Sequence, residues 1–119
     1  AMANSAVRQP VVLVIDDSDD IRNLVVAILG KDHLVKTAED GRSGLKLALE
    51  KPQPDLILLD VVMPGHNGFE VCKLLKGNPA TLAIPVIFLS GRADVANAVR
   101  AAQASSSALG EKTGLASSI

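Results

Sequence analysis

The sequence of 119 residues is poor in aromatic side chains, with two phenylalanines and neither tryptophan nor tyrosine. Proteins that bind single-stranded nucleic acid usually stack the bases on aromatic side chains, so this class is disfavoured. The 12 basic and 13 acidic residues give a formal net charge of −1, without the basic excess that a nucleic-acid surface favours. We therefore expect no direct contact with nucleic acid.

Cysteine and long apolar runs are also scarce. Cys72 is the only cysteine, which excludes a disulfide within the chain and a thiolate metal site. No apolar run reaches membrane-spanning length, and the first residues lack the pattern of a signal peptide. We expect a cytoplasmic protein that does not contact membranes. Residues 1–10 are interpreted as a tag remnant with an N-terminal arm, and residues 11–119 as a single domain.

The chain does contain a regular alternation of strand and helix patterns. Val11–Ile15 is a continuous β-branched run, which is typical of a strand covered on both faces. Apolar residues at helical spacing follow it, with Ser18 as the expected N-cap. The predicted strands are 11–15, 33–37, 55–60 and 85–90, and the predicted helices are 21–29, 43–50, 69–76 and 92–104. Such alternation predicts an α/β domain with a parallel sheet.

The pattern weakens after residue 104, where serine and glycine dominate. The candidate for a fifth strand is 107–111, and no final helix is evident. We therefore expect the domain to be atypical or truncated after about residue 104.

Polar side chains are predicted to gather at one edge of the sheet. In an open parallel sheet, ligands bind at the carboxyl ends of the strands. The first strand is followed by Asp16 and Asp17, the third ends at Asp60, and the fourth ends at Ser90. If a fifth strand ends near Lys112, this residue joins them.

This set of side chains favours phosphoryl chemistry. Three close carboxylates raise one another's pKa unless a cation lies between them, and oxygen ligands favour Mg²⁺. A carboxylate can also act as a nucleophile and form an aspartyl phosphate. Mg²⁺, Lys112 and the Ser90 hydroxyl would then surround the phosphoryl oxygens. A single aspartate at a strand end is usually a cap or a turn residue, so the prediction depends on the joint pattern.

Four segments resemble the receiver domain of bacterial two-component response regulators of the chemotaxis-regulator type. They are Val12–Asp17, Asp55–Pro64, Gly68–Cys72 and Ile84–Gly91. The resemblance implies a flavodoxin-like parallel sheet of order 2-1-3-4-5 with helices on both faces. It also implies transfer of a phosphoryl group to Asp60 from a histidine kinase or a histidine phosphotransfer protein, followed by slow self-catalysed hydrolysis.

The resemblance also implies the metal ligands. Asp17 and Asp60 would bind Mg²⁺ directly, Asp16 would bind it through water, and the backbone carbonyl of Val62 would complete the protein ligands. Mn²⁺ is expected to substitute for Mg²⁺. The change of conformation would regulate an output domain or a partner protein that this chain does not contain, so a signalling domain is expected rather than an enzyme.

Around the phosphoryl group, the resemblance implies a hydrogen bond from Ser90, and Lys112 matches the family's lysine by its spacing. The residues around Lys112 depart from the family pattern, because Thr113 replaces a proline and Leu109 replaces an aromatic residue. Without the family's last helix, apolar surface beside the first and fifth strands would be bare, which favours association of two copies.

Two other functions are possible. One is a degenerate receiver that binds partners without phosphorylation. The other is a phosphatase of the haloacid dehalogenase type, with Asp17 as the nucleophile of an Asp-x-Asp motif completed by Asp19. The continuation at Asp20 and Ile21 does not match that motif, and a cap domain is absent from the sequence.

Overall fold

The structure is a computed structural model and describes residues 9–63 and 65–111. Its strands are β1 (Val11–Ile15), β2 (Leu34–Ala38), β3 (Leu56–Asp60), β4 (Val62–Met63), β5 (His66–Asn67) and β6 (Val86–Leu89). Its helices are α2 (Asp19–Leu29), α3 (Gly41–Leu49), α4 (Gly68–Lys76) and α5 (Arg92–Glu111).

The main sheet is parallel and has the order β2-β1-β3-β6. This order confirms the prediction for the first four strands. All five residues of β1 are buried, as are the four apolar residues of β3, because helices cover both faces of these central strands. The edge strand β2 is more exposed, as its mixed sequence predicts. A short antiparallel pair, β4 and β5, occupies the loop after β3 and was not predicted.

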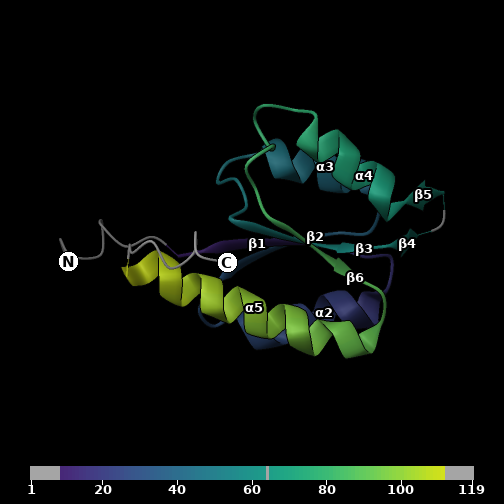
Figure 1. The fold of residues 1–119 in the computed structure, drawn as a ribbon. Coiled ribbons are helices and arrows are strands. Elements are labelled where there is room, and N and C mark those ends of the chain that lie inside the picture. Colours follow the sequence, from purple (N-terminus) through teal and green to yellow (C-terminus); the bar gives the residue numbers. More distant parts are fainter. Residues whose placement is uncertain (1–8, 64, 112–119) are drawn as a thin grey trace.

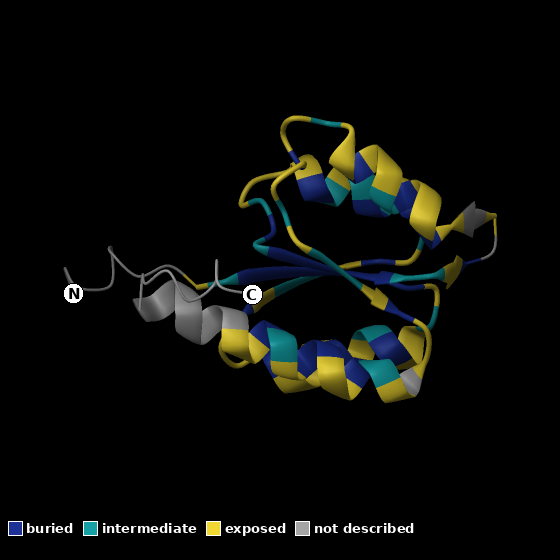
Figure 2. Cartoon of the chain, viewed as in Figure 1, coloured by how far each residue is buried: buried dark blue, intermediate teal, exposed yellow. Residues whose placement is uncertain are grey.

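The helices form two layers around the sheet, with α3 and α4 on one face and α2 and α5 on the other (Figure 1). Among the residues whose burial is described, each helix turns its buried side toward the sheet and its exposed side toward solvent (Figure 2). On the α2 and α5 face, the core contains Val12, Val14, Ile21, Val25, Leu29, Leu56, Leu58, Leu89, Val95, Ala98, Val99 and Ala102. The opposite core contains Leu13, Ile15, Ala38, Ala48, Ile57, Leu59, Met63, Val71 and Leu75.

Helix α5 departs from the prediction for the end of the chain. It was predicted to end at residue 104 but continues to Glu111, so the fifth strand predicted at 107–111 is wrong. Alanine favours a helix, and Val95, Ala98, Val99 and Ala102 form a buried stripe at helical spacing. The segment contains no proline, and it continues in the helical conformation rather than turning back to the sheet.

The position of α5 changes the expectation of bare apolar surface. The helix packs beside α2 and covers the core on that face of the sheet. Apolar surface is therefore not left bare on that face, so it no longer favours self-association. Association of two copies stays a prediction. Lys112 and Thr113, and the segment after them from which the family's last helix was expected to be missing, lie outside the described residues. Within the described part of the chain, no helix has both the length and the apolar character needed to cross a membrane.

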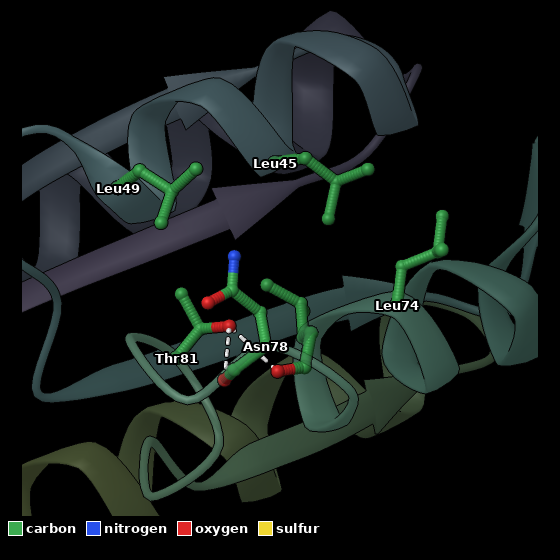
Figure 3. A pocket seen from close by; sticks show the side chains of 6 residues that line it. Leu45, Leu49, Leu74, Asn78 and Thr81 are labelled. Carbon is green, nitrogen blue, oxygen red and sulfur yellow. Dashed lines mark hydrogen bonds between the residues drawn. The ribbon is translucent and has the colours of Figure 1, made fainter.

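The α3 and α4 face carries a hollow. A hollow of about 250 Å³ lies between the two helices and is lined by Leu45, Leu49, Leu74, Leu75, Asn78 and Thr81 (Figure 3). The Thr81 hydroxyl donates to the carbonyl of Leu75 at 2.6 Å, which fixes the loop after α4 at the floor of the hollow. Cys72 is half-buried and packs against the core on this face.

Candidate metal centre

Three carboxylates lie together where β1 and β3 end. Asp16 and Asp17 directly follow β1, and Asp60 is the last residue of β3. The parallel register pairs Ile15 with Leu59, which brings the next residues of the two strands to the same edge. One carboxylate oxygen from each aspartate lies within 4.8 Å of the others. The structure thus brings together the three acidic residues that the sequence singled out.

The Asp16 side of the cluster is held by the start of α2. Asp16 is buried, and its carboxylate accepts the backbone N–H of Ser18 at 2.9 Å. Ser18 is the predicted N-cap of α2, and its hydroxyl oxygen accepts the N–H of Ile21. The Arg22 guanidinium donates to the Asp16 carbonyl at 2.6 Å and also pairs with Asp19. Sequence reasoning missed Arg22, although its position one turn into the predicted helix was the available signal.

The Asp60 side is held by the backbone that follows β3. The N–H of Val62 donates to the Asp60 carboxylate at 3.1 Å. The N–H of Gly68 donates to the Val61 carbonyl at 2.8 Å, so the start of α4 lies against the end of β3. A Cβ atom at Gly68 would lie 2.2 Å from the Asp60 carbonyl oxygen, so only glycine fits this close approach. The Gly68 of the predicted motif therefore shapes the site.

The electrostatics follow from burial and crowding. Burial raises the pKa of Asp16, partly offset by the N–H of Ser18. Burial also raises the pKa of Asp60 to about 6, against the lowering effect of the Val62 N–H, and the nearby charge of Asp16 adds to the rise. Both shifts show that the site disfavours several negative charges without a compensating cation.

This donor set fits a hard divalent ion. Clustered carboxylate oxygens are the ligands that Mg²⁺ uses, together with water and phosphate oxygens. Asp16, Asp17 and Asp60 would hold the ion, and its charge would relieve their mutual repulsion. The carbonyl of Val62 as a further ligand stays a prediction.

The fourth strand places Ser90 at the same edge of the sheet. Asp60 pairs in register with Leu89, and Ser90 follows directly. However, the hydroxyl of Ser90 donates to the carboxylate of Asp94, and its backbone N–H donates to the same oxygen at 2.8 Å. Sequence reasoning missed Asp94, whose signal was an acidic residue in the first turn of the helix after Ser90. Lys112, the other predicted residue of the phosphoryl site, lies outside the described residues.

Comparison with known proteins decides the family. Residues 12–113 match the model of the response regulator receiver domain, which is most of the chain. The chain belongs to the response regulator receiver family. The transcriptional regulatory protein AfsQ1 of Streptomyces coelicolor is 44% identical over 86 residues, which cover 71% of this receiver and 36% of AfsQ1. The receiver thus spans about a third of that relative's length.

Solved structures give the same fold. The chemotaxis protein CheY4 of Vibrio cholerae is 32% identical, with a TM-score of 0.64 and coverage of 77% of this receiver and 81% of that chain. The Mn²⁺-bound form of response regulator Rcp1 is 28% identical, with a TM-score of 0.60 and coverage of 76% and 75%. The predicted flavodoxin-like receiver fold is therefore confirmed, with four strands of its sheet among the described residues.

Proposed function

We propose that this receiver is a phosphorylation-controlled switch that accepts a phosphoryl group on Asp60. The observation that supports the proposal most strongly is the position of Asp60 at the end of β3, with its carboxylate beside those of Asp16 and Asp17. This arrangement offers a nucleophile and a cation site at the same edge of the sheet.

The chemistry is a transfer to a carboxylate oxygen. An Asp60 oxygen attacks the phosphorus of the donor, the bond between phosphorus and the leaving group breaks, and an acyl phosphate forms. Water later attacks this product, releases inorganic phosphate and restores the carboxylate. Mg²⁺, when bound, supplies positive charge that stabilises the phosphoryl oxygens. The proposed roles of Ser90 and Lys112 are a hydrogen bond and a positive charge to the same oxygens.

The protonation state of Asp60 decides whether its carboxyl group can act as the nucleophile. With a pKa of about 6, the Asp60 carboxyl of the metal-free chain retains a proton below that pH and then cannot attack phosphorus. A divalent ion between the three aspartates would favour the ionised form. We propose Mg²⁺ as the natural ion, with Mn²⁺ as a substitute, which the Mn²⁺-bound form of the similar regulator Rcp1 supports.

The proposed partners are those that the family suggests. The phosphoryl donor is proposed to be a histidine kinase or a histidine phosphotransfer protein in the cytoplasm. The output is proposed to be a further domain or a partner protein, as the transcriptional regulatory name of AfsQ1 suggests for a longer relative. Self-association remains a further proposal. In this scheme the receiver is a signalling domain that turns over its own acyl phosphate slowly.

Incubation with acetyl phosphate and Mg²⁺, followed by mass spectrometry of the intact chain, tests this function. We expect an added mass of one phosphoryl group in the wild type, and none in Asp60→Asn or after chelation of the metal. The matched control is Asp32→Asn, which removes an exposed carboxylate outside the site. A folded wild type that stays unmodified would support the degenerate receiver, and continuous turnover in Asp60→Asn would support a phosphatase.

A further inference from the structure

At the end of β6, Ser90 makes an interaction that the proposed function does not use. Ser90 directs both of its donors to one atom, because its backbone N–H and its hydroxyl each donate to Oδ2 of Asp94. Both bonds join the end of β6 to the first turn of α5. The Ser90 hydroxyl is thus engaged by α5 in this conformation. We call these two residues the Ser90–Asp94 pair.

The acceptor in this pair is charged. The two hydrogen bonds from Ser90 lower the pKa of Asp94, so its carboxylate is ionised at neutral pH. The N–H of Asp94 donates to the Gly91 carbonyl at 3.1 Å, which closes the first turn of the helix around the pair. Hydrogen bonds to an ionised acceptor are stronger than bonds between neutral groups.

The hydroxyl of Ser90 has a single proton to donate. It can donate this proton to Asp94 or to a phosphoryl oxygen on Asp60, but it cannot serve both acceptors fully at once. Because Leu89 pairs with Asp60 in the sheet, Ser90 lies one residue beyond the strand position beside the acceptor. Asp94 and a phosphoryl group on Asp60 would therefore compete for the same hydroxyl proton.

We propose that Asp94 is a positioning residue that holds the Ser90 hydroxyl in the resting receiver and must release it when Asp60 is phosphorylated. This inference rests on the proposed phosphorylation of Asp60. Release of the hydroxyl leaves Oδ2 of Asp94 with the backbone N–H of Ser90 and water as donors, and it removes one of the two hydrogen bonds between the end of β6 and α5. Phosphorylation at β3 is thereby coupled to the first turn of α5, the helix that covers the core beside α2.

The test is a calorimetric titration with beryllium fluoride in the presence of Mg²⁺, since this complex mimics a phosphoryl group on a carboxylate. We expect Asp94→Ala to bind it about three- to tenfold more tightly than the wild type, because a solvent-exposed hydrogen bond to a charged group contributes modestly. Ser90→Ala should bind it more weakly. In the Ser90→Ala background, Asp94→Ala should change the affinity less than about twofold, because the competed hydroxyl is absent.

Two controls separate this role from charge and from folding. Glu70→Ala removes an acidic residue from the first turn of α4, the other helix that begins near the site, and should leave the affinity within about twofold. Asp94→Asn keeps the shape of the side chain and should give a smaller gain than Asp94→Ala. Unfolding curves of every variant in urea identify those that do not fold.

The outcomes are distinct. An unchanged affinity in Asp94→Ala and Asp94→Asn, with binding by the wild type, overturns the inference and leaves the proposed function standing. If Asp94→Ala raises the affinity as much in the Ser90→Ala background as in the wild type, the gain is a general effect of charge. This result also overturns the inference. If neither the wild type nor Asp94→Ala binds beryllium fluoride or acquires phosphate, the proposed function fails and the inference fails with it.

Discussion

The two halves of the site differ in how they are assembled. On the β1 and β3 side, the acidic residues come directly from strand ends and lie together without further rearrangement. On the β6 and α5 side, Ser90 is held by Asp94, and the chain then leaves the site along a helix about 30 Å long. One half of the site is therefore a cluster of carboxylates at the edge of the sheet, while the other half is hydrogen-bonded to the first turn of α5.

This difference shows where sheet register is sufficient and where it is not. Register fixes backbone positions, so buried parallel strands place Asp16 and Asp60 side by side. The hydroxyl of Ser90 can rotate about its side-chain bond, so its direction depends on the acceptors nearby. The positions of Asp16 and Asp60 are consequently set by the sheet, whereas the direction of the Ser90 hydroxyl depends on how α5 begins.

The largest predicted effect is the loss of stability that follows when α5 can no longer pack on the sheet. Val95 is buried in the core on the α2 and α5 face, so Val95→Asp places a charge among apolar side chains. We expect a loss of about 3–5 kcal/mol in the free energy of unfolding, measured with urea. Ala96→Asp, at an exposed position of the same helix, should cost no more than about 1 kcal/mol. Equal stability of the two variants would show that α5 does not pack there.

The next largest effect is confined to the side of the site that contains the three aspartates. Gly68→Ala places a Cβ against the Asp60 carbonyl, so the backbone of β3 or α4 must shift. We expect a loss of about 2–3 kcal/mol of stability and a weaker affinity for Mg²⁺, measured by calorimetry. Gly77→Ala at the end of α4 meets its nearest atom at 3.3 Å and is the matched control, with little effect on the metal. Retained Mg²⁺ affinity in Gly68→Ala would contradict the role assigned to this close approach.

A smaller effect concerns pH in the metal-free chain. Folded Asp60 holds its proton more tightly than the unfolded chain, so stability falls as pH rises from the ordinary value of 3.8 to about 6. Because water screens this carboxyl, Asp60→Asn should gain about 1 kcal/mol at pH 7 and nothing near pH 3.5. Urea unfolding at both pH values measures the difference. If Asp60→Asn gains the same stability at both pH values, the gain does not come from the raised pKa of Asp60.

The acidic half could be predicted from the sequence for a physical reason. Continuous apolar runs identify the central parallel strands, and the residues that follow such strands meet at one edge of the sheet. Asp16, Asp17 and Asp60 needed no further information. Ser18 was also predictable, because N-caps follow from local residue preferences.

The end of the chain could not be predicted in the same way. Residues 105–111 lack a marked apolar period, so a strand and a helix were both compatible with them, and the continuation of α5 decided the matter. The bond from Ser90 to Asp94 depends on the angle at which α5 leaves β6. That angle is set by packing of the Val95 and Val99 side of the helix on the sheet, which local sequence does not encode.

Titration of the isotopically labelled chain with Mn²⁺, followed by NMR, tests whether Asp16, Asp17 and Asp60 share one metal ion. A paramagnetic ion broadens the signals of nearby amides, so its position is mapped residue by residue. A metal ion shared by the three aspartates predicts selective loss of the amide signals of residues 16–18 and 60–62, competition by Mg²⁺, and no such loss in Asp60→Asn. Broadening centred elsewhere, or an unchanged pattern in that variant, would contradict a shared metal site of Asp16, Asp17 and Asp60.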